Sequence, residues 1–264
     1  MPNTGQCQIS MNFPEILGLI EKFQDAVAIP WYRGCSKASY KLVPSIARHP
    51  TKSTFDDIYP IEKEMESLFS QRSRPFLQGR PDDKWDSMFL MQHYGLPTRL
   101  MDWSSNPFVA LFFALKPRRG GCVEDAVIWM CDPETWNASV MPLTPAEPKI
   151  LSKDHRRLSD YAIGSRLDQF RPEPLMINGS YNSPRLIAQR GGFTVFGNDL
   201  RPFEDIHHTR KAPPESLQKI VVKKSDCENM FSSLVKKGIT ETFVYPDIAG
   251  LAEELTRMFG FPNG

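Results

Sequence analysis

The stretch of the sequence richest in polar and ionisable side chains that could take part in chemistry is HYGLPTRLMDWSSN at residues 93–106, which stands between two apolar segments. It brings His, Tyr, Thr, Arg, Asp, Trp, Ser and Asn into one connection. Dense polar groups in a loop held between two buried elements are typical of binding and catalytic sites. The run is therefore our first candidate for a functional site.

Part of this run also has a purely structural explanation. Ser104, Ser105 or Asn106 can cap the helix that follows, because short polar side chains accept hydrogen bonds from free amides at a helix start. Arg99 can pair with Asp102, and the indole of residue 103 can belong to the core. These roles explain only some of the polar residues, so both interpretations stay open.

A second candidate is the segment WYRG, which ends in Arg33 and Gly34. We expect a short strand over residues 26–32, which puts the guanidinium at a sheet edge. Guanidinium binds phosphate or carboxylate with two parallel hydrogen bonds. The glycine allows another backbone or a ligand to come close. The alternative is a structural pair between Arg33 and a carboxylate.

A third candidate is Gln189, which follows an apolar segment and stands before the glycine pair at 191–192. An amide at the end of a strand, next to a turn, can contact a ligand. An ordinary β-hairpin explains the same pattern equally well.

The elements that must position these groups follow from hydrophobic periodicity, capping residues and turn residues. We expect helices over 12–26, 55–72, 82–94, 108–115, 225–237 and 250–259, and strands over 26–32, 123–131, 217–222 and 241–245, with two short strands in 186–196. We expect residues 132–150, 171–184 and 197–215 to be ordered, proline-rich loops that wrap a single domain. Helices come mainly first and strands mainly later, so the expected class is α+β.

Composition excludes several classes of protein. The formal charge of +1 leaves no broad basic groove for nucleic acid, although it allows a small pocket with one key arginine. The five cysteines are an odd, widely spaced set, which argues against a disulfide framework or a zinc ribbon. We found no secretory signal and no apolar run long enough for a membrane helix, so we expect a cytoplasmic location without membrane contact.

Together these segments resemble the FRG domain, which is named for its aromatic-Arg-Gly motif. The similarity lies in WYRG at 31–34, in HYGLPTRLMDW at 93–103 followed by Asn106-Pro107, in AQRG at 188–191, and in 238–250. It covers about residues 25–255. We therefore expect one FRG domain across 1–264, with a short polar N-terminal tail.

The order of the motifs is also similar to the Arg–Ser–Glu class of ADP-ribosyltransferases. That resemblance implies a split β-sheet core with N-terminal and inserted helices, and NAD as the substrate. It assigns Arg33 to the pyrophosphate and places Gln189 where the catalytic glutamate would stand. Because Gln189 is neutral, Asp102 is our candidate for the missing carboxylate. The other residues expected to contact the cofactor are Tyr32, Gly34, His93, Tyr94, Thr98, Arg99, Trp103 and Asn106, with Tyr32, Tyr94 or Trp103 stacking on a ring of NAD.

The resemblance thus implies an NAD-dependent ADP-ribosyltransferase or NAD glycohydrolase without a metal, acting as a bacterial toxin or antiphage-defence effector on a protein or nucleic-acid acceptor. One alternative is a non-catalytic sensor of NAD, ADP-ribose or a related nucleotide. Another is a protein-interaction module, which a sealed and filled cavity would favour. A metal-dependent nuclease is disfavoured, because carboxylates are sparse in the motifs.

Overall fold

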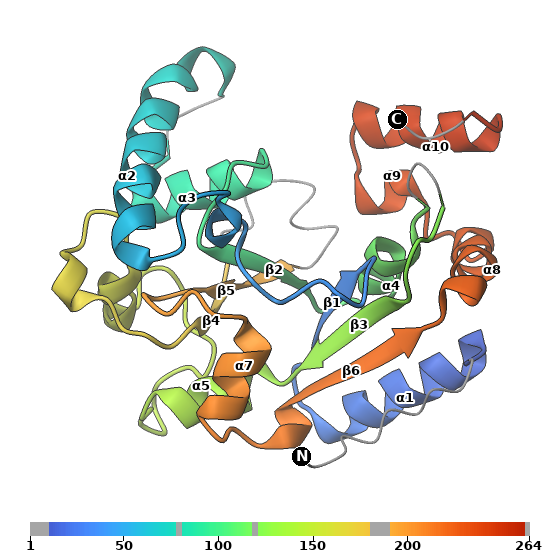
Figure 1. Cartoon of the computed structure of the whole chain (residues 1–264), viewed down its shortest axis with the longest axis horizontal. Coiled ribbons are helices and arrows are strands. Elements are labelled where there is room, and N and C mark those ends of the chain that lie inside the picture. Colours follow the sequence, from blue (N-terminus) through green and yellow to red (C-terminus); the bar gives the residue numbers. More distant parts are fainter. Residues whose placement is uncertain (1–10, 78–80, 118–120, 180–190, 262–264) are drawn as a thin grey trace.

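The computed structural model of the chain describes residues 11–77, 81–117, 121–179 and 191–261, and six strands in these ranges form one antiparallel sheet in the order β4-β5-β2-β1-β3-β6 (Figure 1). The strands are β1 Trp31–Cys35, β2 Leu100–Ser104, β3 Ala126–Cys131, β4 Leu175–Asn178, β5 Gly191–Val195 and β6 Leu217–Val222. The α-helices are α1 Phe13–Ala26, α2 Phe55–Arg72, α3 Lys84–His93, α4 Pro107–Leu115, α5 Pro133–Val140, α7 Phe203–Thr209, α8 Lys224–Lys236, α9 Glu241–Val244 and α10 Ile248–Met258. The expected α+β class is confirmed. None of the described helices is long and apolar enough to cross a membrane.

The sheet consists of two three-stranded halves that are joined at a single position. Strand β1 pairs with β3 along its whole length, and β2 pairs in the same way with β5. Between β1 and β2, in contrast, only Tyr32 and Ser104 are paired. The two halves lie side by side in Figure 1, with β1, β3 and β6 on the right and β2, β5 and β4 on the left. The centre of the sheet is therefore also its weakest seam.

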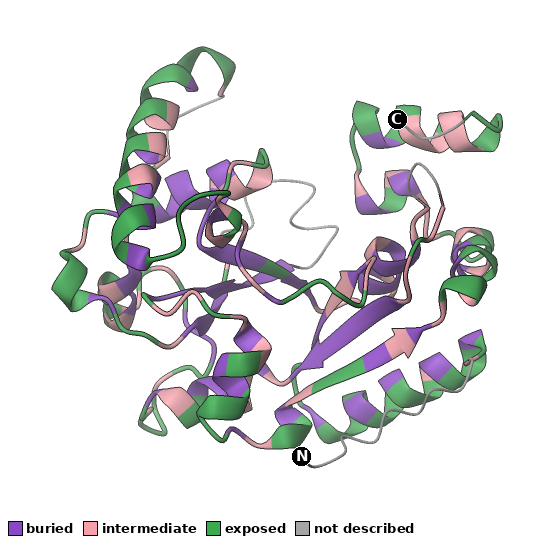
Figure 2. Ribbon diagram, in the orientation of Figure 1, coloured by how far each residue is buried: buried purple, intermediate pink, exposed green. Residues whose placement is uncertain are grey.

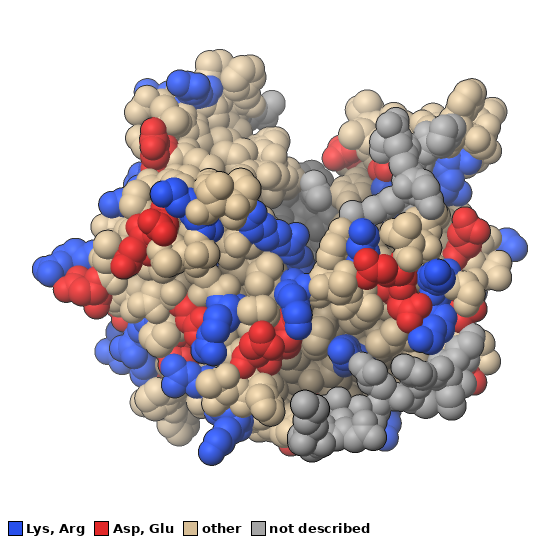
Figure 3. Space-filling model, in the orientation of Figure 1, with Lys and Arg blue, Asp and Glu red and all other residues tan. Residues whose placement is uncertain are grey.

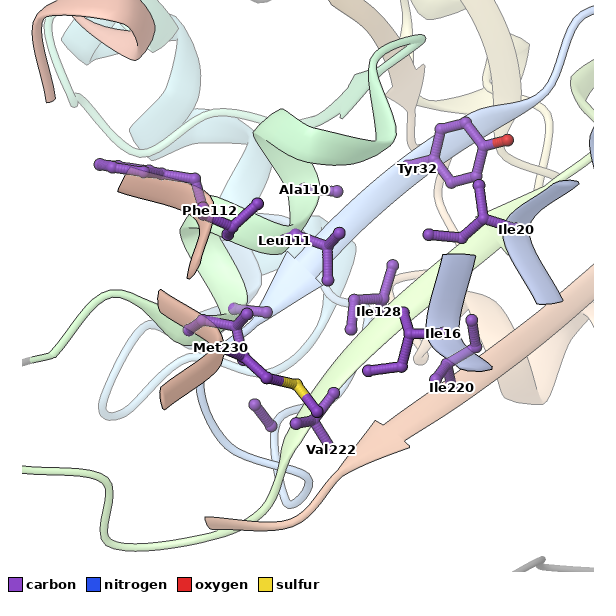
Figure 4. Close-up of a cluster of buried hydrophobic side chains, with 14 of the residues drawn as sticks. Ile16, Ile20, Tyr32, Ala110, Leu111, Phe112, Ile128, Ile220, Val222 and Met230 are labelled. Carbon is purple, nitrogen blue, oxygen red and sulfur yellow. The ribbon is translucent and has the colours of Figure 1, made fainter. Parts of the chain in front are cut away.

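Two separate hydrophobic cores cover the same face of the sheet, one on each half. Helices α1, α4 and α8 pack on the half that contains β1, where Ile16, Leu111 and Met230 meet Ile128 (Figure 4). Helix α3 packs on the other half, where Phe89 contacts Phe193. Helices α5 and α7 cover the opposite face. Strands β1 to β5 are accordingly buried over most of their length, whereas the edge strand β6 is exposed or half-buried over most of its length (Figure 2).

Local sequence signals explain most of the helix ends. Asn12 accepts a hydrogen bond from the amide of Glu15, and the Glu15 carboxylate accepts one from the amide of Asn12, which is a complete capping box. Asp83 caps α3, and Gly95 follows that helix with a φ of 81°, a backbone angle that favours glycine. Asn106 caps α4, with Pro107 in the first turn. All six expected helices are present, with small shifts at their ends.

Several expectations about strands and loops are wrong. Residues 100–104, expected to be part of a loop, form β2, and β1 begins at Trp31, so Arg33 and Gly34 lie inside a strand. Residues 241–244 form α9 instead of a strand, because the Thr240 side chain caps a helical turn there. The three loops at 132–150, 171–184 and 197–215 contain α5, β4 and α7. Of the two short strands expected in 186–196, β5 covers Gly191–Val195, and residues 186–190 lie outside the described ranges.

Candidate functional site

A pocket of about 280 Å³ opens in the seam between the two halves of the sheet. Its apolar walls come from both cores: Phe89 and Phe193 from one, and Val109 and Ala110 from the other. Its polar lining comprises Arg33, Ser36, Tyr40, Arg48, Gln92, His93, Asp102 and Ser104. The pocket thus lies where β1 and β2 part, and it collects residues from two of the three candidate motifs.

Arg33 and Asp102 face each other across this seam. The Arg33 guanidinium donates a hydrogen bond of 2.5 Å to the backbone carbonyl of Asp102 and lies 3.9 Å from Oδ2 of its carboxylate. The Arg33 side chain is 23% exposed and that of Asp102 is 52% exposed. Both charged groups therefore remain open to a ligand in the pocket.

A chain of hydrogen bonds connects Asp102 to the interior of the protein. Gln92, in the last turn of α3, donates from Nε2 to Oδ2 of Asp102 at 2.8 Å. Its Oε1 accepts from the Thr98 hydroxyl at 2.6 Å, and that hydroxyl accepts from the amide of Leu100 at 3.1 Å. Thr98 is fully buried, so it supports the pocket wall from behind and does not line the pocket.

Gly34 lines the pocket, but its tight contact is with a helix. A Cβ atom added at Gly34 would lie 1.9 Å from the carbonyl oxygen of Ala110 in α4. Since no side chain fits at that distance, the glycine allows α4 to pack against β1. Of the two expectations for Gly34, close approach of another backbone is the one the structure contains.

Arg99 does not lie in the pocket, and the expected pair between Arg99 and Asp102 is wrong. Its side chain is fully buried, with Nε at 2.7 Å from the Glu62 carboxylate and the two terminal nitrogens at 2.7 Å from the carbonyls of Tyr161 and Phe196. The guanidinium also lies over the ring of Phe170. Arg99 is an internal anchor for the start of β2.

The aromatic residues expected to stack on a ligand differ in where they lie relative to the pocket. Tyr32 borders the pocket, but it is fully buried with its ring edge-on to Phe23, and burial raises the pKa of its hydroxyl to about 12. Trp103 also borders the pocket, and its Nε1 donates to the Thr194 hydroxyl at 2.7 Å on the opposite face of the sheet. Tyr94 is exposed and lies outside the pocket. Asn106 also lies outside, where it caps α4.

Six polar or reactive lining residues were not among the site residues we expected: Cys35, Ser36, Tyr40, Arg48, Gln92 and Ser104. Helical spacing puts Gln92 on the same face of α3 as Trp85 and His93, which is the signal the sequence carries for it. Burial raises the pKa of the Cys35 thiol, and the nearby guanidinium groups of Arg33 and Arg48 partly offset this. Gln189 lies outside the described residues. Among the described residues, no group of His, Cys, Asp and Glu side chains is arranged to hold a metal ion.

The fold and the pocket define an α+β protein with a small polar site in the seam of an antiparallel sheet. Residues 29–120, which carry β1, β2 and α4 as well as most of the pocket, match the family model of the FRG domain. This part of the chain is therefore similar to the FRG domain. A search of curated proteins and a search of solved structures returned no match.

Proposed function

We propose that this pocket binds NAD and cleaves its nicotinamide–ribose bond, as an ADP-ribosyltransferase or an NAD glycohydrolase. The observation that carries the proposal is the convergence of Arg33, His93, Asp102 and Ser104 on one open pocket. Polar and charged groups that meet in a concave, partly apolar site are the usual mark of a ligand site.

Each charged residue has a chemical task in this reaction. Arg33 binds the pyrophosphate, because guanidinium pairs with phosphate oxygens in a bidentate manner. Breaking the bond to nicotinamide develops positive charge on the ribose, and the Asp102 carboxylate stabilises that charge. The volume of about 280 Å³ is at the lower end of the range for small-molecule sites. We therefore assign the pocket to the nicotinamide-ribose end of the dinucleotide.

The order of the elements supports this proposal. Arg33 lies in β1, β2 ends at Ser104 and is followed directly by α4, and β5 begins at Gly191. The resemblance to Arg–Ser–Glu ADP-ribosyltransferases implies an arginine on the first strand, then a Ser/Thr position, here Thr98, with a helix behind it, and then a glycine turn before a later strand. A sheet divided in two halves fits the split core of that class. A role as a toxin or antiphage-defence effector, with a protein or nucleic-acid acceptor, belongs to the same proposal.

A second candidate function is a nucleotide sensor that binds NAD or ADP-ribose without turnover. One observation favours it: Oδ2 of Asp102 already accepts from Gln92 and lies 3.9 Å from Arg33. Positive and hydrogen-bond-donating neighbours reduce the negative potential that a carboxylate can offer to a cation. A protein-interaction module is disfavoured, because the pocket is open at Asp102 rather than sealed.

The test is to incubate the purified protein with NAD and to measure released nicotinamide by chromatography, with and without cell lysate as a source of acceptor. We expect release by the wild type and its loss in Arg33→Gln and Asp102→Asn. Asp168→Asn, a change of an exposed carboxylate in a local ion pair with Arg166, is the matched control and should keep full activity. Binding of ADP-ribose without release would select the sensor, and absence of both binding and release would overturn both functions.

A further inference from the structure

We infer that Gln92 is the residue that positions the Asp102 carboxylate for reaction. This inference rests on the proposed function, because it assigns a task within the same site. Gln92 lines the pocket next to Asp102 and is the only described side chain that donates a hydrogen bond to its carboxylate at less than 3 Å.

The direction of the hydrogen bonds fixes which end of the amide meets the carboxylate. The Leu100 amide can only donate, so the Thr98 oxygen must accept from it. The single hydroxyl proton of Thr98 is then left for Oε1 of Gln92, which turns Nε2 toward Asp102. An ionised carboxylate only accepts, so every bond in the chain has one allowed direction.

Thr98 and Gln92, the two residues that support Asp102 through hydrogen bonds, are both attached to buried parts of the structure. The backbone of Thr98 is attached to the turn at residues 45–48: its amide donates to the Ser45 hydroxyl at 3.0 Å, and its carbonyl accepts from the Ile46 amide at 3.2 Å. Gln92 follows the fully buried Met91 in α3. A rigid support of this kind is what a catalytic group needs to keep its orientation.

The consequence for Asp102 is that its two oxygens have different tasks. Both contacts of the carboxylate within the described residues, with Gln92 and with Arg33, use Oδ2. Oδ1 accepts no hydrogen bond from the described part of the chain and is the oxygen assigned to the ribose. Without Gln92, the carboxylate is released to rotate toward Arg33, which would neutralise both groups and remove the charge from the reaction.

The experiment compares Gln92→Met, which keeps length and removes both hydrogen bonds, with Gln92→Glu, which keeps the acceptor for Thr98 and puts a second carboxylate beside Asp102. We expect kcat for nicotinamide release to fall about 10- to 100-fold in Gln92→Met, with a KM for NAD within about threefold, as for loss of a hydrogen bond to a charged group. In Gln92→Glu the acid limb of the kcat profile should move to higher pH, because two adjacent carboxylates resist full ionisation. Gln71→Met, on the exposed side of α2, is the matched control and should keep activity.

A second readout does not depend on turnover. The orientation of the Asp102 carboxylate, seen in crystal structures of the ligand-free wild type and of Gln92→Met, should turn toward Arg33 in the variant. A turned carboxylate in a protein that releases no nicotinamide would keep the positioning role and overturn the proposed catalytic function. An unchanged orientation in folded Gln92→Met, together with an unchanged kcat in an active protein, would overturn the positioning role alone.

Discussion

Two arginines from the sequence motifs, Arg33 and Arg99, occupy opposite environments in this protein. Arg99 is fully buried and its three donor groups are all engaged, one with Glu62 and two with backbone carbonyls. Arg33 lies in the pocket, keeps 23% of its side chain exposed, and has its nearest carboxylate 3.9 Å away.

The surroundings of the two arginines distinguish a structural role from a ligand-binding role, which the residue type alone does not. A buried ion pair in which each nitrogen of the guanidinium already donates holds elements together and is closed to a ligand. The Arg33 guanidinium, which lies beside an open pocket 3.9 Å from its nearest carboxylate, can exchange that distant carboxylate for a phosphate. The two environments therefore predict opposite outcomes for stability and for binding, and the experiments below test that opposition.

The largest effect is expected for Arg99→Met. This change leaves the Glu62 carboxylate buried without its partner, and Oε1 of Glu62 already has no hydrogen-bond partner among the described residues. We expect a loss of about 3–5 kcal/mol in the free energy of unfolding, measured by urea denaturation. The double variant Arg99→Met/Glu62→Met should recover much of that loss, because no charge remains in the interior. A loss below 1 kcal/mol in the single variant would contradict the anchoring role of Arg99.

Arg33→Gln should show the reverse pattern. We expect the free energy of unfolding to change by less than about 1 kcal/mol, because the ion pair with Asp102 is exposed and long. Affinity for NAD, measured by calorimetry, should fall about 10- to 100-fold, and wild-type affinity should weaken as salt is added. The opposition breaks down if Arg33→Gln unfolds as easily as Arg99→Met while its affinity for NAD is unchanged.

The sequence supports the helices and the family resemblance, but it does not separate these two arginines. The helices are predictable because their caps and apolar stripes are local, as for Asn12 with Glu15 and for Asn106 with Pro107. Strand β2 is not, because Asp102 faces the pocket while its neighbours are buried by contacts with β5, far away in the chain.

The partners of the motif residues are hidden from the sequence for the same reason. Arg99 binds Glu62 from α2, and the support for Asp102 comes from Gln92 on α3, so both partners depend on how the helices pack. The charge balance predicts a surface without one broad basic field, and Figure 3 shows Lys and Arg side chains interspersed with acidic ones on the face in view.

Gly34→Ala tests whether the region around the pocket also depends on the tight packing of β1 against α4. The added Cβ would lie 1.9 Å from the Ala110 carbonyl oxygen, so β1 and α4 must move apart. We expect a loss of about 1–3 kcal/mol in unfolding free energy. Gly18→Ala in α1 is the matched control: no atom lies within 4 Å of the added group, and alanine favours the helix by about 0.5–1 kcal/mol. Equal effects of the two changes would refute the packing role of Gly34.

The smallest effect is expected at Cys35, which reports the charge of the pocket without any ligand. Burial raises the pKa of this thiol, and Arg33 lowers it in opposition. In Arg33→Gln the guanidinium no longer offsets the effect of burial. The pKa of Cys35 therefore rises, and its thiolate fraction at pH 8 falls. Alkylation of Cys35, followed by peptide mass spectrometry, should then become slower by a few-fold, since the thiolate is the reactive form.

The internal reference for this measurement is Cys227, whose pKa burial raises to about 12 and which lies in a different core, on α8. Its slow alkylation should be the same in both proteins. Arg166→Gln, which removes an exposed arginine held by Asp168, controls for a general loss of positive charge and should leave Cys35 unchanged. Faster alkylation of Cys35 in Arg33→Gln, at an unchanged rate for Cys227, would mean that Arg33 shields the thiol more than it charges the pocket. The surroundings of Arg33 would then resemble the closed environment of Arg99, and the contrast between the two arginines would fail.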